Sequence, residues 1–351
     1  MKLVIFGLSI SSSWGNGHAT IWRGLCRALA SRRHQVVFFE RDVPYYAEHR
    51  DLTELPGLRL CLYPSWEEVV AAARAELSGA DAAIVTSYCP DAIAASDLVL
   101  SSNTRSVFYD LDTPVTLDRL RRGEAVEYIG PRGLRDFDLV LSYTGGAALT
   151  ELRERLGARR VFPLFGSVDP EAHRPVPSLE RFRADLSYLG TYAQDRQGTL
   201  DALFLAPARL LPERRFVLGG ALYPQEFPWT ENIFFVRHLP PAEHPAFYSS
   251  SALTLNVTRR AMACMGYCPS GRLFEAAACG TPVLSDEWDG LDSFFEPGRE
   301  ILIARDTADA LEALQTGRDE LARIGRNARE RTLAEHTAAR RARELERYLE
   351  N

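Results

Sequence analysis

The residues with the clearest chemical potential lie in one short segment, Ser270–Ser285. Ser270 and Gly271 interrupt the preceding structure, so the free backbone amides at the start of the next helix can face an anion. Arg272 adds a planar guanidinium beside those amides. Glu275 lies one helical turn later on the same face, where a carboxylate can accept hydrogen bonds from two neighbouring hydroxyl groups. The segment therefore predicts a nucleotide site, with Arg272 on a diphosphate and Glu275 on a ribose.

The same segment carries a family resemblance. Gly280 and Pro282 end its helix before an apolar strand. The whole pattern resembles the donor-binding segment of the two-domain GT-B glycosyltransferases and is most similar to the CgeB-like (spore maturation) branch. Family-4 glycosyltransferases usually carry a second glutamate eight residues before the one that matches Glu275, and this chain has Tyr267 there. The resemblance therefore leaves retention or inversion of the sugar's configuration open.

A glycine-rich loop, Trp14-Gly15-Asn16-Gly17-His18, follows the first predicted strand and leads into a helix. Glycines let the backbone approach a ligand closely. The loop resembles the GxGH loop of GT-B enzymes, in which backbone amides and the histidine approach the sugar or the acceptor. It lacks the dinucleotide fingerprint and a Walker lysine, which argues against NAD or ATP. His18 is a candidate general base on an acceptor hydroxyl, and capping the turn or binding the donor phosphate are its alternative roles.

Two carboxylates follow the strand predicted to end at Tyr109. Residues just beyond such a strand face the ligand crevice of an open parallel sheet, and alternation places Asp110 and Asp112 on one side. Either is a candidate base or acceptor-binding group, and CgeB-like proteins carry a similar stretch. Asp112 could instead cap a helix. The sequence does not choose the base among His18, Asp110 and Asp112. The stretch 40–42 also points to this crevice, with a local ion pair as the alternative.

Further donor contacts are predicted after strands of the second half. Gly190 and Thr191 end its first strand, and with Arg196 they can bring backbone and a guanidinium to a diphosphate. The nucleobase is predicted near His238 and Leu239, because GT-B enzymes hold the base after the matching strand; a surface turn is the alternative. The predicted donor site comprises Gly190, Thr191, Arg196, His238, Leu239, Arg259, Ser270, Gly271, Arg272 and Glu275.

One of the neighbouring residues Arg259 and Arg260 is expected to join Arg272 in neutralising the diphosphate, and we assign Arg259 to this role. Arginines and helix-start amides can stabilise a leaving diphosphate by themselves. We therefore expect no metal and no cofactor, with a nucleoside-diphosphate sugar as co-substrate and UDP, GDP and dTDP all open.

The chain alternates apolar runs with helical patterns, which predicts two Rossmann-like α/β domains with a cleft between them. Strands are expected near 3–8, 35–39, 82–86, 105–109, 138–142, 186–190, 214–219, 233–236, 252–257, 282–285 and 300–303, with helices near 19–32, 65–78 and 145–156. The predicted boundaries are an acceptor domain 1–165, a linker 166–180, a donor domain 181–330 and a C-terminal helix 331–351 that packs back on the first domain.

Composition narrows the class of protein. The 351 residues exceed what one core usually organises, and the net charge of −6 argues against a nucleic-acid partner. Six scattered cysteines suit a reducing compartment. No apolar segment of membrane-spanning length is present, so a cytoplasmic protein is expected.

The leading hypothesis is thus a metal-independent hexosyltransferase that acts on an unknown acceptor, whether a small molecule, a glycan or a protein. A nucleotide-sugar epimerase or hydrolase on the same fold, or a noncatalytic surface or spore-coat binding protein, are the alternatives.

Overall fold

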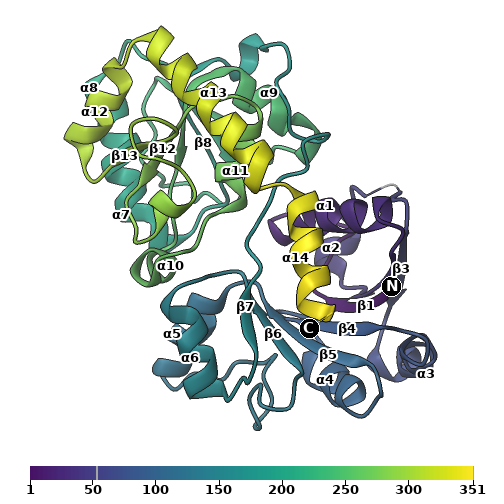
Figure 1. Cartoon of the computed structure of the whole chain (residues 1–351). Helices are drawn as coiled ribbons and strands as arrows, with labels where there is room; N and C mark the ends of the chain where they lie inside the picture. The colour runs from purple at the N-terminus through teal and green to yellow at the C-terminus, as the bar shows by residue number, and fades with distance from the viewer. Residues whose placement is uncertain (53, 351) are drawn as a thin grey trace. The chain divides into compact units, whose positions relative to one another are not determined.

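The computed structural model describes residues 1–52 and 54–350, and the chain divides into two compact units. The first unit comprises Met1–Phe165 and Ala338–Asn351, and the second comprises Gly166–Thr337. Each unit is a parallel sheet covered by helices (Figure 1).

The described strands of the first unit form a seven-stranded sheet in the order β3-β2-β1-β4-β5-β6-β7. They are β1 (Lys2–Gly7), β2 (Gln35–Arg41), β3 (Leu58–Tyr63), β4 (Ala82–Thr86), β5 (Arg105–Asp110), β6 (Leu139–Ser142) and β7 (Val161–Pro163). The helices are α1 (His18–Ser31), α2 (Pro44–Ala47), α3 (Trp66–Leu77), α4 (Ala92–Leu100), α5 (Thr113–Arg121), α6 (Ala147–Leu156) and α14 (Ala338–Glu350). The strand order reverses direction between β1 and β4, which is where open α/β sheets bind ligands.

The described strands of the second unit form a six-stranded parallel sheet in the order β10-β9-β8-β11-β12-β13. They are β8 (Ala184–Leu189), β9 (Phe216–Gly220), β10 (Ile233–Arg237), β11 (Ser251–Asn256), β12 (Val283–Asp286) and β13 (Leu302–Ala304). The helices are α7 (Gln197–Leu200), α8 (Ala206–Leu210), α9 (His244–Ser249), α10 (Arg260–Met265), α11 (Gly271–Ala278), α12 (Thr307–Gln315) and α13 (Arg318–Glu335). Here too the order reverses, between β8 and β11.

The burial of the central strands explains why these strands could be predicted from the sequence. The central strands are apolar on both faces, as in β1, where Leu3, Val4, Ile5 and Phe6 are fully buried. These runs match the predicted strands. The edge strand β3 was not predicted, although it carries the apolar run Leu60–Tyr63; most of its side chains are half-buried or exposed. The short β7 and the helices α4 and α5 were also not predicted.

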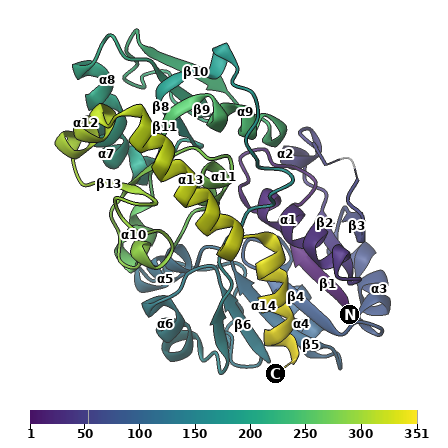
Figure 2. The ribbon, with the colours of Figure 1, turned by 45° about the horizontal axis from the view of Figure 1, so that its top comes forward.

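The last helix returns to the first unit. In Figure 1, α14 lies beside α1, and the two helices are in contact. Glu346 on α14 accepts two 2.6 Å hydrogen bonds from Arg32, and the ring of Tyr348 stacks on Phe162 with 4.6 Å between centroids. The predicted boundary after residue 330 falls inside α13, which instead packs along α11 of the second unit (Figure 2). Residue 351, the end of the predicted helix, lies outside the described residues.

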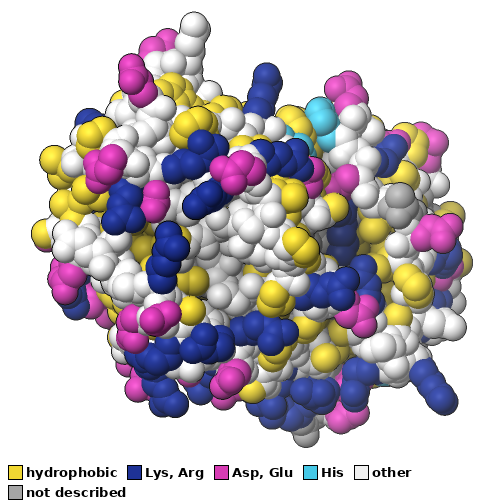
Figure 3. Space-filling model, turned by 90° about the horizontal axis from the view of Figure 1, so that it is seen from above, with side chains coloured by type: hydrophobic (Ala, Val, Ile, Leu, Met, Phe, Trp, Pro, Cys, Tyr) yellow, Lys and Arg dark blue, Asp and Glu magenta, His cyan; other side chains and the backbone are white. Residues whose placement is uncertain are grey.

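The surface carries mixed charge. On the face in Figure 3, basic and acidic side chains are interspersed. Several ion pairs of the chain have helical spacing, such as Arg323 with Glu320 and Arg331 with Glu335. Within residues 1–52 and 54–350, every helix is too short or too polar to cross a membrane.

Candidate functional site

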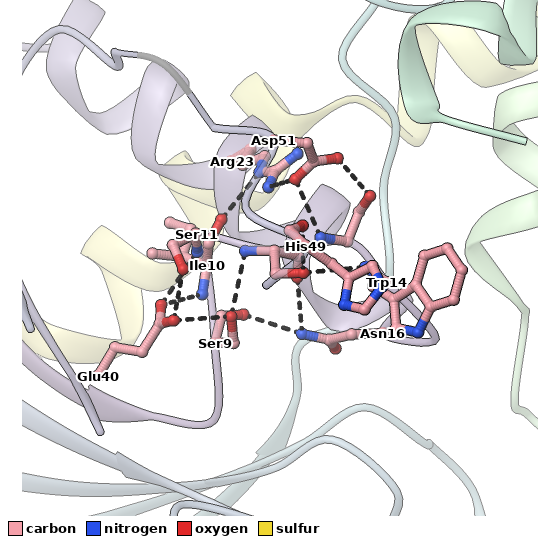
Figure 4. Close-up of polar contacts among 11 residues, drawn as sticks. Ser9, Ile10, Ser11, Trp14, Asn16, Arg23, Glu40, His49 and Asp51 are labelled. Carbon is pink, nitrogen blue, oxygen red and sulfur yellow. Dashed lines mark hydrogen bonds and ion pairs between the residues drawn. The ribbon is translucent and has the colours of Figure 1, made fainter. Parts of the chain in front are cut away.

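The loop after β1 is held by a buried carboxylate from the neighbouring strand. Glu40 is the second-last residue of β2 and is only 1% exposed. Its Oε2 accepts hydrogen bonds from the backbone amides of Ile10 (2.7 Å) and Ser11 (3.0 Å). Its Oε1 accepts from the hydroxyls of Ser9 (2.9 Å) and Ser11 (2.5 Å), as Figure 4 shows. Glu40 therefore shapes the loop from beneath, which corrects the expectation that it points to the crevice or forms an ion pair.

Asn16 joins this loop to α1. Its Nδ2 donates to the carbonyl oxygens of Ser9 (3.1 Å) and Ser12 (3.3 Å), and its Oδ1 accepts from the backbone amide of His18 at 3.1 Å. Asn16 is 6% exposed, so its amide belongs to the scaffold of the loop. It fixes the place at which His18 begins the helix.

Gly15 and Gly17 of this loop differ in whether the backbone conformation requires a glycine. Gly15 has φ of +59°, in the left-handed region that favours glycine. Gly17 has φ of −66° and precedes α1, and a Cβ there would meet nothing within 4 Å. The indole of Trp14 stacks on the imidazole of His49 with 4.1 Å between ring centroids (Figure 4). Trp14 is thus already paired with a side chain of the first unit.

Removing the Glu40 carboxylate tests its role in the loop. The Glu40→Ala variant leaves the buried amides of Ile10 and Ser11 without their acceptor. We expect a loss of roughly 2–4 kcal/mol in the unfolding free energy of the first unit. Differential scanning calorimetry should show a lowered melting temperature. Glu48→Ala, which removes an exposed glutamate from the following segment, is the control and should leave the melting temperature within about 1 °C; equal effects of the two changes would contradict the assigned role.

His18 and Asp112 lie close together at this edge of the sheet. His18 begins α1 and Asp112 follows β5, two strands away from β1 in the sheet. The His18 Nε2 lies 3.7 Å from the Asp112 Oδ2, and both side chains are partly accessible, at 18% and 16%. Burial lowers the pKa of His18, and the Asp112 carboxylate opposes this shift. A mostly neutral imidazole beside a carboxylate is equipped to take a proton.

The two aspartates occupy different environments, although alternation predicts one side for both. Asp110 is fully buried, and its Oδ1 accepts from the backbone amide of Asp112 at 3.1 Å. Asp112 precedes α5, but within the described part of the chain its side chain makes no capping hydrogen bond. Of the two, the structure places Asp112 beside His18 and encloses Asp110 beneath it.

Burial gives Asp110 a measurable signature. It raises the pKa of Asp110 from 3.8 to about 7. Because the folded-state pKa is above the unfolded value, the protonated carboxyl favours the folded state. This contribution is complete below pH 3.8 and is lost as the pH rises through about 7.

The Asp110→Asn variant, which stays neutral, should remove that pH dependence. Between pH 5 and pH 9 the wild-type protein should lose about 2–3 kcal/mol relative to the variant, because about two pH units separate pH 5 from the folded-state pKa. Melting temperatures measured across this range check the prediction. Parallel curves for the two proteins would show that Asp110 titrates as it does in the unfolded chain.

In the second unit, the predicted phosphate-binding residues end β8. The backbone amide of Gly190 donates to Gly219 at 2.8 Å. A Cβ on Gly220, whose φ is +156°, would lie 2.0 Å from the Gly190 carbonyl oxygen. The sequence did not single out Gly220, yet only glycine permits this close approach. Arg196 donates from Nη1 to the Thr191 carbonyl at 3.3 Å. Its Nε is buried without a hydrogen-bond partner among the described residues.

Arg259 and Arg272, the two arginines predicted to neutralise the diphosphate, have different partners. Arg259 pairs with Asp195, at 3.0 Å between Nε and Oδ2. Arg272 is on the first turn of α11, with its guanidinium carbon 5.9 Å from the centre of the Tyr188 ring. The start of α11 is tied to the end of β11, because Ser270 Oγ donates to Asn256 Oδ1 at 2.7 Å. Arg272 and the α11 amides therefore lie together, as predicted, whereas Arg259 is engaged by a carboxylate.

Glu275 lies one turn further along α11 and faces two histidines that the sequence did not reveal. Its Oε1 is 4.0 Å from His173 Nε2, and its Oε2 is 3.8 Å from His244 Nδ1. Burial alone would raise the pKa of Glu275, but the two imidazoles and the guanidinium of Arg272 lower it to about 2. Glu275 is therefore ionised at neutral pH. His173 lies in the second unit, in the segment of the sequence that precedes β8, and His244 begins α9. No sequence pattern joins them to Glu275.

Residues 238 and 239, which are predicted to bind the nucleobase, lie next to the group formed by Glu275, His173 and His244. His238 follows β10 with φ of +47°, and its backbone amide donates to Gly220 at 2.8 Å. Leu239 is buried, and its carbonyl oxygen accepts from His244 Nε2 at 3.3 Å. The residues predicted for base, ribose and diphosphate thus follow one another from Leu239 through Glu275 to Arg272.

Tyr267, at the position of the missing glutamate, has φ of +49° and is 38% exposed. Its backbone amide donates to Asp289 at 2.7 Å, and its ring lies against Gly290, where a Cβ would be 2.6 Å away. The tyrosine therefore covers a turn.

Comparisons with known proteins agree with this architecture. Residues 196–347 match the family model described as "Glycosyl transferase-like". Sucrose-phosphate synthase from Thermosynechococcus elongatus has a TM-score of 0.73 at 16% identity, over 99% of this chain and 98% of that one. HepE from Anabaena in complex with UDP-glucose has a TM-score of 0.72 at 13% identity, over 100% of this chain and 99% of that one.

An alpha-glucosyltransferase in complex with UDP and a 13-mer DNA has a TM-score of 0.71 at 14% identity, over 100% of this chain and 99% of that one. No curated protein matches the sequence significantly. The chain has the two-domain GT-B fold of glycosyltransferases, and its residues 196–347 match a glycosyl transferase-like family.

Proposed function

We propose that this protein is a glycosyltransferase of the CgeB-like branch that moves a hexose from a nucleoside-diphosphate sugar to an acceptor hydroxyl without a metal ion. The observation that carries the proposal is the order of groups around α11. Leu239, Glu275 and Arg272 lie in the sequence in which a nucleotide presents base, ribose and diphosphate. The structural neighbours bound to UDP or UDP-glucose support a uridine donor.

The diphosphate is bound by cationic and backbone groups. Arg272 and the free amides of α11 provide a fork of donors and a partial positive charge. The Nε of Arg196, which is buried without a partner among residues 1–52 and 54–350, can add a further donor. These groups stabilise the charge that develops on the leaving diphosphate, so the reaction proceeds without a metal.

The acceptor is activated by the first unit. His18 removes the proton of the acceptor hydroxyl, whose oxygen attacks the anomeric carbon as the bond to the diphosphate breaks. Asp112 orients the imidazole and stabilises its protonated form. Direct displacement of this kind inverts the configuration of the sugar.

Thermal stabilisation by a panel of UDP, GDP, dTDP and ADP, with and without magnesium, tests the donor site, because a ligand that binds the folded state raises the melting temperature. We expect a shift with one diphosphate that persists in EDTA. A shift that requires magnesium would contradict the metal-independent mechanism.

Turnover of the matching nucleotide sugar then distinguishes the activities. Rapid release of the diphosphate without an acceptor would identify a hydrolase or epimerase. A protein that binds none of the nucleotides would be a noncatalytic binding module.

A further inference from the structure

Tyr88 lies in the turn between β4 and α4, in a backbone conformation that a tyrosine rarely adopts. Its φ is +63°, in the left-handed region that is unfavourable for a residue with a Cβ. The turn is tied to the neighbouring strand, because the backbone amide of Ser87 donates to the Tyr109 carbonyl at 3.0 Å and the Ser87 Oγ accepts from the Leu111 amide at 2.9 Å. Strained residues persist where the surrounding structure fixes them, and they concentrate at functional sites. The turn therefore holds Tyr88 beside the segment that leads to Asp112.

The Tyr88 side chain contacts both members of the proposed catalytic pair. The centre of its ring lies 5.9 Å from the centre of the His18 imidazole, and its hydroxyl donates a hydrogen bond to the Asp112 carboxylate. Burial raises the pKa of Tyr88, and the negative charge of Asp112 adds to this shift. The hydroxyl therefore keeps its proton at neutral pH. Asp112 thus has a hydrogen-bond donor that does not depend on His18.

Tyr88 is itself held by a second tyrosine. Tyr128 is buried, its ring centre lies 5.1 Å from that of Tyr88, and a hydrogen bond joins the two hydroxyls. The Tyr128 hydroxyl is also 2.7 Å from the Thr116 Oγ1. The backbone amide of Thr116 in turn donates to the Asp112 carbonyl at 3.1 Å. These contacts form a closed ring that starts and ends at Asp112, so they restrain the place of its carboxylate.

The restrained carboxylate stands just beyond hydrogen-bonding distance of the imidazole. The His18 Nε2 and the Asp112 Oδ2 are 3.7 Å apart, whereas an N–H···O hydrogen bond spans about 2.7–3.2 Å. The His18 Nδ1 is buried without a hydrogen-bond partner among residues 1–52 and 54–350, so an acceptor hydroxyl cannot reach it. Proton transfer must then use Nε2. That nitrogen cannot take a proton while it donates one to Asp112.

We propose that Tyr88 is a positioning residue for the general base: its hydroxyl restrains the Asp112 carboxylate, so that the His18 Nε2 stays free for the acceptor hydroxyl. This inference rests on the proposed transferase function. Without the Tyr88 hydroxyl, the carboxylate can rotate and accept a direct hydrogen bond from Nε2. The protonated imidazole is then stabilised, and the neutral imidazole has its reactive nitrogen occupied.

Titration of His18 in the Tyr88→Phe variant tests this role, because phenylalanine keeps the ring and removes only the hydroxyl. NMR of the histidine rings in the full chain follows the titration, and the signal that disappears in His18→Ala identifies His18. We expect the midpoint in Tyr88→Phe to rise by about one pH unit, the effect of a new hydrogen bond to a charged group. Asp112→Asn should lower the midpoint. The double variant should match Asp112→Asn, because Tyr88 acts through Asp112.

Other titratable groups near the pair are separated by a second background. Asp112 and Tyr88 face His18, and Asp110 and Tyr128 act on Tyr88. Burial raises the pKa of Tyr128, so this residue stays protonated in the measured range. Burial raises the pKa of Asp110 to about 7, which lies within that range. The comparison is therefore repeated in Asp110→Asn protein, where the upward shift caused by Tyr88→Phe should persist.

Tyr63→Phe is the matched control. The Tyr63 hydroxyl donates to the Asp91 carboxylate at 3.0 Å, and Asp91 ends the same turn, directly before α4. This variant removes an equivalent tyrosine–aspartate hydrogen bond from the turn without touching Asp112. The midpoint of His18 and the turnover should both stay at their wild-type values.

Kinetics measure the consequence for the reaction. Tyr88→Phe should lower kcat by about 10- to 100-fold, since the hydrogen bond between Nε2 and Asp112 must break before the base can act. The KM of the nucleotide sugar should stay within about twofold, because its proposed site belongs to the second unit. The acidic limb of the kcat/KM profile should move to higher pH, opposite to the shift expected for Asp112→Asn.

The titration and the kinetics separate the two hypotheses. An unchanged or lowered His18 midpoint in Tyr88→Phe, or an equal rise in Tyr63→Phe, would overturn the role of Tyr88 and leave the transferase standing. The expected rise in a protein that transfers no sugar would keep the restraint on Asp112 and overturn the proposed function.

Discussion

Replacing His18 by alanine should lower kcat by about 10²- to 10⁴-fold, the usual contribution of a general base. UDP affinity should stay within about twofold of wild type, because the proposed UDP site is built entirely from the second unit. Initial rates with a nucleotide sugar and its acceptor, together with UDP titration, measure both quantities. His18 lies 3.7 Å from Asp112, so the two residues should also share one pH signature.

The direction in which the pH dependence of activity should shift can also be predicted. A general base must be neutral, so activity falls as the pH drops through the pKa of His18. Burial lowers that pKa and the Asp112 carboxylate raises it. The Asp112→Asn variant should therefore move the acidic limb of the kcat/KM profile to lower pH while reducing turnover. Full turnover in His18→Ala, or an acidic limb that Asp112→Asn leaves in place, would remove His18 from the role of base.

The second large effect is expected at Arg272. Arg272→Ala should weaken UDP binding by about 10- to 100-fold, because hydrogen bonds to a charged group contribute about 1.5–3 kcal/mol. Arg272→Lys should recover part of the loss, since lysine keeps the charge but not the planar fork. The melting-temperature shift caused by UDP reports the same ranking.

Two other arginines serve as comparisons. Arg259→Ala should have a smaller effect, because this residue is engaged by Asp195. Arg209→Ala removes an exposed guanidinium from α8 and should leave the affinity unchanged. An Arg272→Ala protein that binds UDP as Arg209→Ala does would place the diphosphate elsewhere.

The fold could be predicted from the sequence because its central strands are buried on both faces. Continuous apolar runs such as Leu3–Phe6 and Val283–Leu284 predicted parallel strands, and the structure has them in β1 and β12. The half-exposed edge strand β3 was missed even though Leu60–Tyr63 form such a run. Local signals also located the α11 segment, because Ser270, Arg272 and Glu275 are close in sequence and one helix determines their spacing.

The site depends more on contacts between distant segments. Asp110 and Asp112 are equivalent in an alternating pattern, but the chain turns into α5 after β5, which buries the first and leaves the second beside His18. Glu40 was expected at the ligand crevice or in a local ion pair, yet it is enclosed by a loop that lies some 30 residues earlier in the sequence.

The sequence by itself determined the two α/β halves and the position at which α11 begins, with Arg272 on its first turn, because both follow from periodicity and from neighbours along one element. Only the tertiary structure decided that His173 and His244 face Glu275, that Glu40 carries the loop before His18, and that Gly220 lies against Gly190. Each of these contacts joins segments of one unit that are distant in the sequence. Their distances depend on packing, which no single segment of the sequence specifies.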